Sequence, residues 1–249
     1  DRDDCGRKYV TLSRTASLSR QLSLFFKHHI NSILKNGIYG NISKSGKRNI
    51  SIVYSGGDDV FVVGAWDDVI SFAVDLTDKF REFTEGTLTV SAGIGIYDSS
   101  FPISICAQEV DKLESMSKSY SKHNNDNPEK NAVTLFDTKD VFKSELLSEI
   151  ELKQTYNWID FKNKVIAEKL DTLKEFFGFK VEKDDSDNDY GASFLYKLMF
   201  LLRNSDADKI NYARYVYLLS RMEPSKNSTA EAVSKYRKFS EKMYEWIKN

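Results

Sequence analysis

The stretch between residues 50 and 64 most strongly constrains how this chain can fold. It reads ISIVYSGGDDVFVVG, two short runs rich in β-branched and aromatic residues on either side of a Gly-Gly-Asp-Asp centre. In the first run Ile50, Ile52 and Tyr54 alternate with the residues between them, and the second run is continuously apolar. Both patterns are typical of β-strands. We therefore predict a β-hairpin, in which two strands are joined by a very short, glycine-rich turn.

The predicted turn combines two glycines, Gly56 and Gly57, with two carboxylates, Asp58 and Asp59. Glycine permits backbone angles that are closed to other residues and leaves no side chain over the turn, so a phosphate could approach the backbone closely. Magnesium takes oxygen ligands and keeps waters and substrate phosphates in its shell, so one or two carboxylates suffice to bind it. An ordinary hairpin turn would use the same residue types. The apolar strands around the turn, and the amphipathic segment that follows, favour the magnesium site.

The composition indicates a folded chain with one or two domains in its 249 residues. Hydrophobic residues make up 41% and aromatic residues 13%, which is too much for a disordered chain. The net charge of −1 reveals no strongly basic surface. Cys5 and Cys106 lie far apart without metal-ligand spacing, and they indicate either a reducing compartment or nothing about the compartment. Without a signal peptide or a membrane-spanning run, we expect a cytoplasmic protein with no membrane contact, and its start at Asp1 suggests a piece of a longer one.

Helical and strand patterns alternate in the first half of the chain. Apolar residues recur at helical spacing over residues 11–35 and 67–83, on either side of the hairpin. A strand with small residues (88–96), a helix (102–121) and a short strand (132–136) follow. The small residues of the strand indicate close approach of another backbone or of a ligand. With a first strand expected upstream, this order predicts a ferredoxin-like arrangement of helices layered on one sheet.

The second half is predicted to contain helices only. Apolar residues repeat at helical spacing around residues 166–177, 195–202, 210–217 and 233–247. We therefore predict two domains, an α/β (α+β) domain over residues 1–136 and an all-α domain over residues 137–249. From Arg203 onward the sequence has ten basic and six acidic residues. This excess fits either a solvated surface or one that contacts RNA or a partner.

The first residues carry three carboxylates within DRDD, at Asp1, Asp3 and Asp4. They form either a solvated terminus or the end of a strand that lies upstream. In the second case Asp1 or Asp3 would stand beside the hairpin carboxylates. The serines and arginines at the start of the following helix either cap and solvate it or face a nucleotide, because helix N-termini attract anions. These residues are Ser13, Arg14, Ser17, Ser19 and Arg20.

Together these motifs resemble the palm domain of the nucleotide-cyclase and polymerase superfamily. They resemble more closely the second palm and the C-terminal helical domain of the large subunit of type III CRISPR effector complexes, in the Csm subtype. That subunit carries YSGGDD, an apolar strand and then GxWD, which are found here at residues 54–67. Its DxDNLG motif is matched by residues 1–6, with departures at Asp4 and Cys5. Further matches are LSRQL at 18–22, Phe25-Phe26 and SAGI at 91–94.

The related diguanylate cyclases provide a second resemblance. Their palm has a helix that ends in a phosphate-binding lysine, followed by Arg-Asn and a strand. Here Asp111 is followed seven residues later by Lys118, and Lys130-Asn131 precedes the next strand. The residues inside the helix are altered and the polar insertion at 123–130 is longer, so the lysine is matched with departures.

The resemblance implies a ferredoxin-like palm, or nucleotide-cyclase, domain that makes cyclic oligoadenylates from ATP. It implies catalytic roles for Asp58 and Asp59, which together with Asp1 would bind two Mg²⁺ (or Mn²⁺) ions. Nucleotide contacts are expected at Ser19, Ser55, Gly56, Gly57 and Lys118. The expected partners are the other subunits of the complex, the guide RNA and the target RNA that activates it. The nuclease and first palm domains of the full subunit lie outside this sequence, so DNA cleavage is not expected of it.

Two alternatives remain at this point. The first is a diguanylate or mononucleotide cyclase, although Asp59-Val60 stands where diguanylate cyclases have Glu-Phe. The second is a non-catalytic palm that binds ATP or RNA-associated subunits and serves as a scaffold. The intact Gly-Gly-Asp-Asp sequence favours chemistry over a purely structural role.

Overall fold

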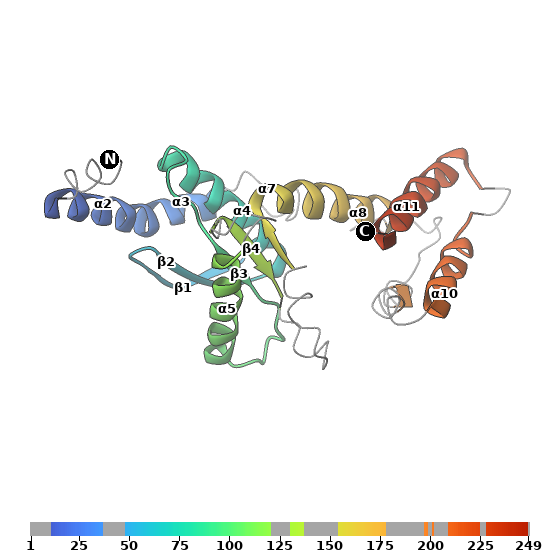
Figure 1. Cartoon of the computed structure of the whole chain (residues 1–249), viewed down its shortest axis with the longest axis horizontal. Helices are drawn as coiled ribbons and strands as arrows, with labels where there is room; N and C mark the ends of the chain where they lie inside the picture. Colours follow the sequence, from blue (N-terminus) through green and yellow to red (C-terminus); the bar gives the residue numbers. More distant parts are fainter. Residues whose placement is uncertain are drawn as a thin grey trace, which may run out of the picture. The chain divides into compact units, whose positions relative to one another are not determined.

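The structure is a computed structural model, and it divides into two compact units, the first ending at Lys162 and the second beginning at Asn163 (Figure 1). It describes residues 11–36, 48–120, 130–136, 154–177, 197–198, 201, 209–224 and 228–248. The mixed α/β class predicted from the sequence is confirmed.

The first helix of the first unit is interrupted by a π-helical segment. Helix α2 (Leu12–Leu24) is capped by Thr11, whose hydroxyl accepts a hydrogen bond from the Arg14 backbone N–H at 3.3 Å. The π-helical segment η1 (Phe25–His29) and helix α3 (Ile30–Lys35) continue it. The predicted helix over residues 11–35 is therefore confirmed, with a widened turn where Phe25 and Phe26 enter the core.

The predicted hairpin is formed by β1 (Ile50–Gly56) and β2 (Asp59–Gly64), which pair antiparallel. A β-bulge interrupts the pairing between Ile52 and Tyr54. The side chains of a strand alternate between its two faces. The extra residue of a bulge therefore moves each side chain after it to the opposite face from the one that regular alternation predicts. Ile52 therefore faces the core, whereas Tyr54 is 56% exposed.

A second sheet contains three short strands. Strand β3 (Ala92–Ile94) pairs parallel with β4 (Ala132–Leu135), and helix α5 (Ile103–Lys118) connects them. Strand β5 (Thr155–Asn157) pairs antiparallel with β4. The expectation of helices only beyond residue 136 is wrong at β5. Within the described residues the two sheets are separate. The predicted single sheet is therefore not continuous there, and the predicted strand 88–96 is shortened to Ala92–Ile94.

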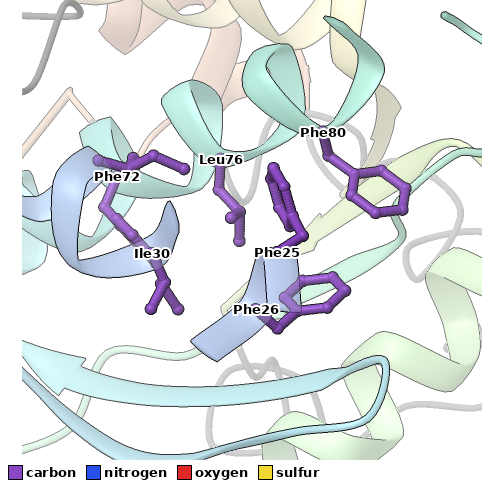
Figure 2. Close-up of a cluster of buried hydrophobic side chains, with 7 residues drawn as sticks. Phe25, Phe26, Ile30, Phe72, Leu76 and Phe80 are labelled. Atoms are coloured by element: carbon purple, nitrogen blue, oxygen red, sulfur yellow. The ribbon is translucent and has the colours of Figure 1, made fainter. Parts of the chain in front are cut away.

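One core cluster of the first unit lies between the hairpin and helix α4 (Trp66–Phe83) (Figure 2). Its buried members are Phe25, Phe26, Ile30, Ile33, Phe72, Leu76 and Phe80. The Phe25 and Phe80 rings meet edge to face with centroids 5.3 Å apart. The hairpin packs Ile50, Ile52, Val60 and Val62 against this cluster. Since burying one such side chain stabilises by about 1.5–3 kcal/mol, the core fixes the hairpin on the helices.

Residues beyond β4 extend the first unit. The Trp158 indole N–H, in the short helix α7 (Trp158–Asp160), donates to the Val90 carbonyl at 2.8 Å. The π-helical segment η2 (Phe161–Leu170) then leads into the second unit. The contacts thus place the end of the first compact unit at Lys162. The predicted domain boundary at residue 136 stays a prediction.

The described part of the second unit is helical. It contains α8 (Asp171–Phe177), α10 (Lys209–Ser220) and α11 (Ala230–Lys248), which confirms helices at three of the four predicted places. Its core consists of Leu198, Tyr215, Leu219, Met222, Phe239 and Met243. The Phe176 ring stacks on Phe239 with centroids 3.8 Å apart. The predicted helix around 195–202 lies largely outside the described residues. Among the helices described, none is long and apolar enough to cross a membrane.

Candidate functional site

The Gly-Gly-Asp-Asp sequence forms the tight turn that its residues predict. Gly56 pairs with Asp59 across the hairpin, so Gly57 and Asp58 form a two-residue turn. Gly57 has φ of +66°, which suits a residue without a side chain and is typical of the first central position of a type II′ turn. Asp58 in the turn and Asp59 at the start of β2 are both exposed. Two carboxylates are therefore accessible from solvent at the tip of a hairpin held by the core.

The two glycines meet different surroundings. A Cβ atom added at Gly57 would have nothing within 4 Å, so this residue is needed for its backbone angle. A Cβ atom at Gly56 would stand 3.1 Å from the Tyr54 hydroxyl oxygen, which also donates to the Gly56 carbonyl at 3.4 Å. The outer side of the turn at Gly57 is thus open, as close approach of a phosphate requires. The phosphate contact itself stays a prediction for both glycines.

Ser55 faces the inside of the unit and is hydrogen bonded. Its hydroxyl donates to the Phe26 backbone carbonyl at 2.6 Å. This residue was expected to contact a nucleotide, and that assignment stays a prediction. The structure adds a contact that the residue pattern did not predict, because the bulge before Tyr54 turns Ser55 inward.

Lys118 is the last residue of α5. Its ammonium group forms an ion pair with the Glu114 carboxylate at 2.8 Å. The hydrogen bond to Glu114 is the largest cause that raises the pKa of Lys118, and desolvation opposes it. The Asp59 carboxylate contributes to the same increase in pKa. Lys118 is therefore in electrostatic range of Asp59. The phosphate contact expected of Lys118 stays a prediction.

Two predicted site residues are not brought to the turn by described contacts. Asp1 lies outside the described residues. Ser19 is exposed in the middle of α2, whereas the N-terminus of that helix is at Leu12. The argument from an anion-binding helix N-terminus therefore does not reach Ser19, and its assignment stays a prediction. In the part of the chain that the structure describes, no group of three or more His, Cys, Asp or Glu residues could hold a metal ion.

A buried polar network at the base of the hairpin was missed by the sequence analysis. The Arg48 guanidinium forms an ion pair with Asp75 of α4, and their side chains are only 5% and 6% exposed. It also donates to the Ile33 carbonyl at 2.9 Å and to the Ser71 hydroxyl at 3.0 Å. The signal that could have revealed it is Asp75 itself, a charged residue next to Leu76 on the apolar side of α4. The network anchors the hairpin to two helices.

A second contact holds the same end of the hairpin. The Asn49 backbone N–H donates to the Asp68 carboxylate at 2.7 Å, and the Ala65 N–H donates to the Asn49 carbonyl at 2.9 Å. Asp68 is 4% exposed, and its other carboxylate oxygen has no partner among the described residues. The base of the hairpin is thus fixed by buried polar groups, while its tip carries exposed carboxylates.

Two protein-family models match the chain. The model of the Cas10/Cmr2 second palm domain matches residues 3–133. The model of the second helical domain of the Cmr2 subunit of the CRISPR RNA silencing complex matches residues 174–249. The first match includes the hairpin, α4, α5 and nearly all residues of the candidate site.

Curated relatives give the same result over most of the chain. The Cas10/Csm1 single-strand-specific deoxyribonuclease of the subtype III-A CRISPR system from Mycobacterium tuberculosis is 40% identical over 245 residues, which is 97% of this chain and 26% of the relative. The protein of the same description from Enterococcus italicus is 40% identical over 89% of this chain and 24% of the relative. This chain therefore spans about a quarter of the length of these relatives.

Solved structures share the fold. A crystal structure of a Csm1–Csm4 cassette in complex with one ATP matches with a TM-score of 0.57 and 26% identity. The match covers 88% of this chain and 29% of that chain. The match thus extends over most of this chain, and the similar cassette is in complex with one ATP.

Proposed function

Since this chain belongs to the Cas10/Cmr2 family, as the second palm and helical domain of the large subunit of a Csm-type III CRISPR effector complex, we propose that it is an ATP-dependent nucleotidyltransferase. Its product would be a cyclic oligoadenylate, made when the complex binds target RNA. The observation that carries this proposal is the tight Gly57-Asp58 turn, with two exposed carboxylates and Lys118 in electrostatic range.

The donor set at the turn fits a hard divalent cation. Asp58 and Asp59 offer carboxylate oxygens, which suit Mg²⁺ or Mn²⁺, and Asp1 is proposed as a further ligand. When bound, such ions would lower the pKa of a ribose hydroxyl and offset charge on the departing pyrophosphate. Gly57 leaves the outer side of the turn open to the triphosphate, and Lys118 would bind one of its phosphates. No protein nucleophile is needed, because phosphoryl and nucleotidyl transfer depend mainly on positioning and electrostatics.

The partners belong to the same proposal. The similar Csm1–Csm4 cassette with bound ATP supports ATP as the nucleotide and a Csm4-like subunit as a neighbour. We extend this to the guide RNA and the target RNA, and to a cytoplasmic location, on the basis of the family. The deoxyribonuclease activity in the relatives' names is not proposed here, because the match covers only about a quarter of their length.

The test is the double variant Asp58→Ala with Asp59→Ala in the intact complex, supplied with target RNA, ATP and magnesium. The proposal predicts that oligoadenylate synthesis falls to background while assembly and RNA binding persist. Asp98→Ala, an exposed carboxylate outside the site, is the matched control and should leave the rate unchanged. Synthesis by the double variant at the normal rate would show that the turn is not the catalytic site. Comparison of ATP with GTP separates this activity from that of a diguanylate cyclase.

A scaffold role is the second candidate, and the outer face of the hairpin favours it. Val53 and Tyr54 of β1 are large apolar residues that are at least half exposed, and so is Trp66, the first residue of α4. Such a face suits contact with another protein surface, and it does not conflict with catalysis at the turn. Calorimetry with the assembled complex would distinguish the two roles. A catalytic palm should bind ATP in a magnesium-dependent way, and the Asp58 and Asp59 double variant should lose this binding. A pure scaffold should show no such binding at the turn.

A further inference from the structure

The inner face of the hairpin next to the turn is apolar except at Ser55. Val60, its partner across the hairpin, packs against the core cluster of phenylalanines and isoleucines. A hydroxyl in such surroundings needs a hydrogen-bond acceptor, because leaving it unpaired is costly. The Phe26 backbone carbonyl provides one at 2.6 Å, across 29 residues of sequence.

Both sides of this hydrogen bond depend on an irregularity of the backbone. The bulge between Ile52 and Tyr54 exchanges the faces of β1, so that Ser55 points inward where regular alternation would point it outward. Phe26 lies in the π-helical segment η1, where the regular i to i+4 bonding of the helix is interrupted. Without either feature the hydroxyl and this carbonyl would not meet in the present way.

The bond lies immediately next to the candidate catalytic residues. Ser55 precedes Gly56, and Gly56 pairs directly with Asp59. Phe26 is 3% exposed and contacts the Phe80 ring of α4, with centroids 5.5 Å apart, so its backbone is held in the core. An atom fixed to this backbone is therefore fixed relative to the whole unit.

We propose that Ser55 is a positioning residue, whose hydrogen bond to the Phe26 carbonyl fixes the position of the Gly-Gly-Asp-Asp turn relative to the π-helical segment. The role rests on the proposed nucleotidyltransferase function and deepens it. Ser55 acts through the backbone of the turn, and the carboxylates of Asp58 and Asp59 depend on it for their position. This differs from a direct contact between Ser55 and the nucleotide.

The test compares Ser55→Ala with Ser51→Ala in the intact, target-bound complex. Ser51 lies on the same strand and is exposed, so it is a matched control. For Ser55→Ala we expect kcat to fall by about ten- to a hundredfold, because small misplacements of reacting groups are costly. KM for ATP should change by less than about twofold, since no binding contact is removed. Amide hydrogen exchange of residues 56–59 should become faster only in this variant.

Several results would overturn the proposal. Equal kcat in the two variants would show that the hydrogen bond does not position the turn. A higher KM for ATP with unchanged kcat would assign Ser55 to nucleotide binding instead. Unchanged amide exchange at the turn would contradict the proposal without reference to activity. If Ser55→Ala fails to assemble, Ser55→Cys, with a weaker donor of similar shape, should show the same changes at smaller size. Absence of product from the wild-type complex would refute the proposed function, and the exchange comparison would still test the role of Ser55.

Discussion

Gly93 of β3 lies directly against the backbone of Glu114 in α5: a Cβ atom added at Gly93 would stand 2.6 Å from the Glu114 amide nitrogen. It would also stand 2.6 Å from the Val110 carbonyl oxygen. Backbone atoms cannot move aside as a flexible side chain can. The missing side chain at Gly93 therefore determines how closely α5 packs on the sheet, and with it the position of Lys118 at the end of that helix.

The close packing at Gly93 should make this position sensitive to any added side chain. Gly93→Ala should lower the free energy of unfolding by about 1–3 kcal/mol, since an added methyl group forces the helix away from the strand. Gly93→Ser should cost more. Urea unfolding of the chain measures both, with the exposed-loop variant Ser99→Ala as the control. A Gly93→Ala variant as stable as the control would mean that α5 does not pack as closely as the structure shows.

Lys118 should contribute to binding of ATP rather than to folding. Its side chain is half exposed, and it lies in electrostatic range of Asp59. Lys118→Met should raise KM for ATP roughly tenfold to a hundredfold, the range expected for losing a hydrogen bond to a charged group. Lys112→Met, at an exposed position of the same helix, should leave KM unchanged. Steady-state kinetics of the target-bound complex provides the measurement, and equal KM values in the two variants would refute the assignment.

The buried ion pair between Arg48 and Asp75 should be costly to break. Asp75→Ala leaves the Arg48 guanidinium buried without its carboxylate, so unfolding free energy should fall by about 3–5 kcal/mol. Glu82→Ala removes a carboxylate from an exposed pair with Lys79 on the same helix, and it should leave the urea midpoint unchanged. Should the two variants unfold at the same urea concentration, the network would not be what anchors the hairpin.

The hydrogen bonds of the Glu168 carboxylate should make the stability of the second unit depend on pH. Its carboxylate accepts hydrogen bonds from Lys242 at 2.9 Å and from the Trp246 indole at 3.3 Å, and these hold the pKa of Glu168 below its ordinary value of 4.5. A lowered folded pKa means that the ionised group stabilises the unit above that value, and that this contribution disappears as pH falls through the folded pKa.

Glu168→Gln should therefore have a slightly lower Tm than the wild type at about pH 7, and the difference should shrink as the pH falls below 4.5 and the carboxylate becomes protonated in the folded chain. Thermal unfolding followed by circular dichroism at about pH 7 and at an acidic pH below the folded pKa measures it. Glu175→Gln, exposed on α8, is the control and should show no such pH-dependent difference. A Tm difference that persists at the acidic pH would contradict the role given to these hydrogen bonds.

Local sequence patterns were sufficient to predict the elements whose structure depends on neighbouring residues in the sequence. The hairpin and the helices α4 and α5 follow from apolar periodicity and from Gly57, and the structure confirms them. The electrostatic effect of Asp59 on Lys118 joins residues so far apart in sequence that they give no pattern of their own, and a shared site for them was suggested only by the family resemblance.

Features that depend on distant partners were not predictable. Strand β5 has only three residues and exists because it pairs with β4. Regular alternation along β1 places Tyr54 on the face of Ile52, and the bulge reverses this, so the inward direction of Ser55 could not be read from the sequence. The ion pair of Arg48 with Asp75 joins groups 27 residues apart and requires the tertiary fold.

We propose that this chain makes cyclic oligoadenylate at the Gly-Gly-Asp-Asp turn when its complex binds target RNA. The most direct test measures ATP turnover with magnesium by the intact multisubunit complex, with and without target RNA, and identifies the products by mass. Cyclic oligoadenylate is expected only when target RNA is present. No product from a fully assembled, target-bound complex would contradict it and would leave the hairpin with a structural role.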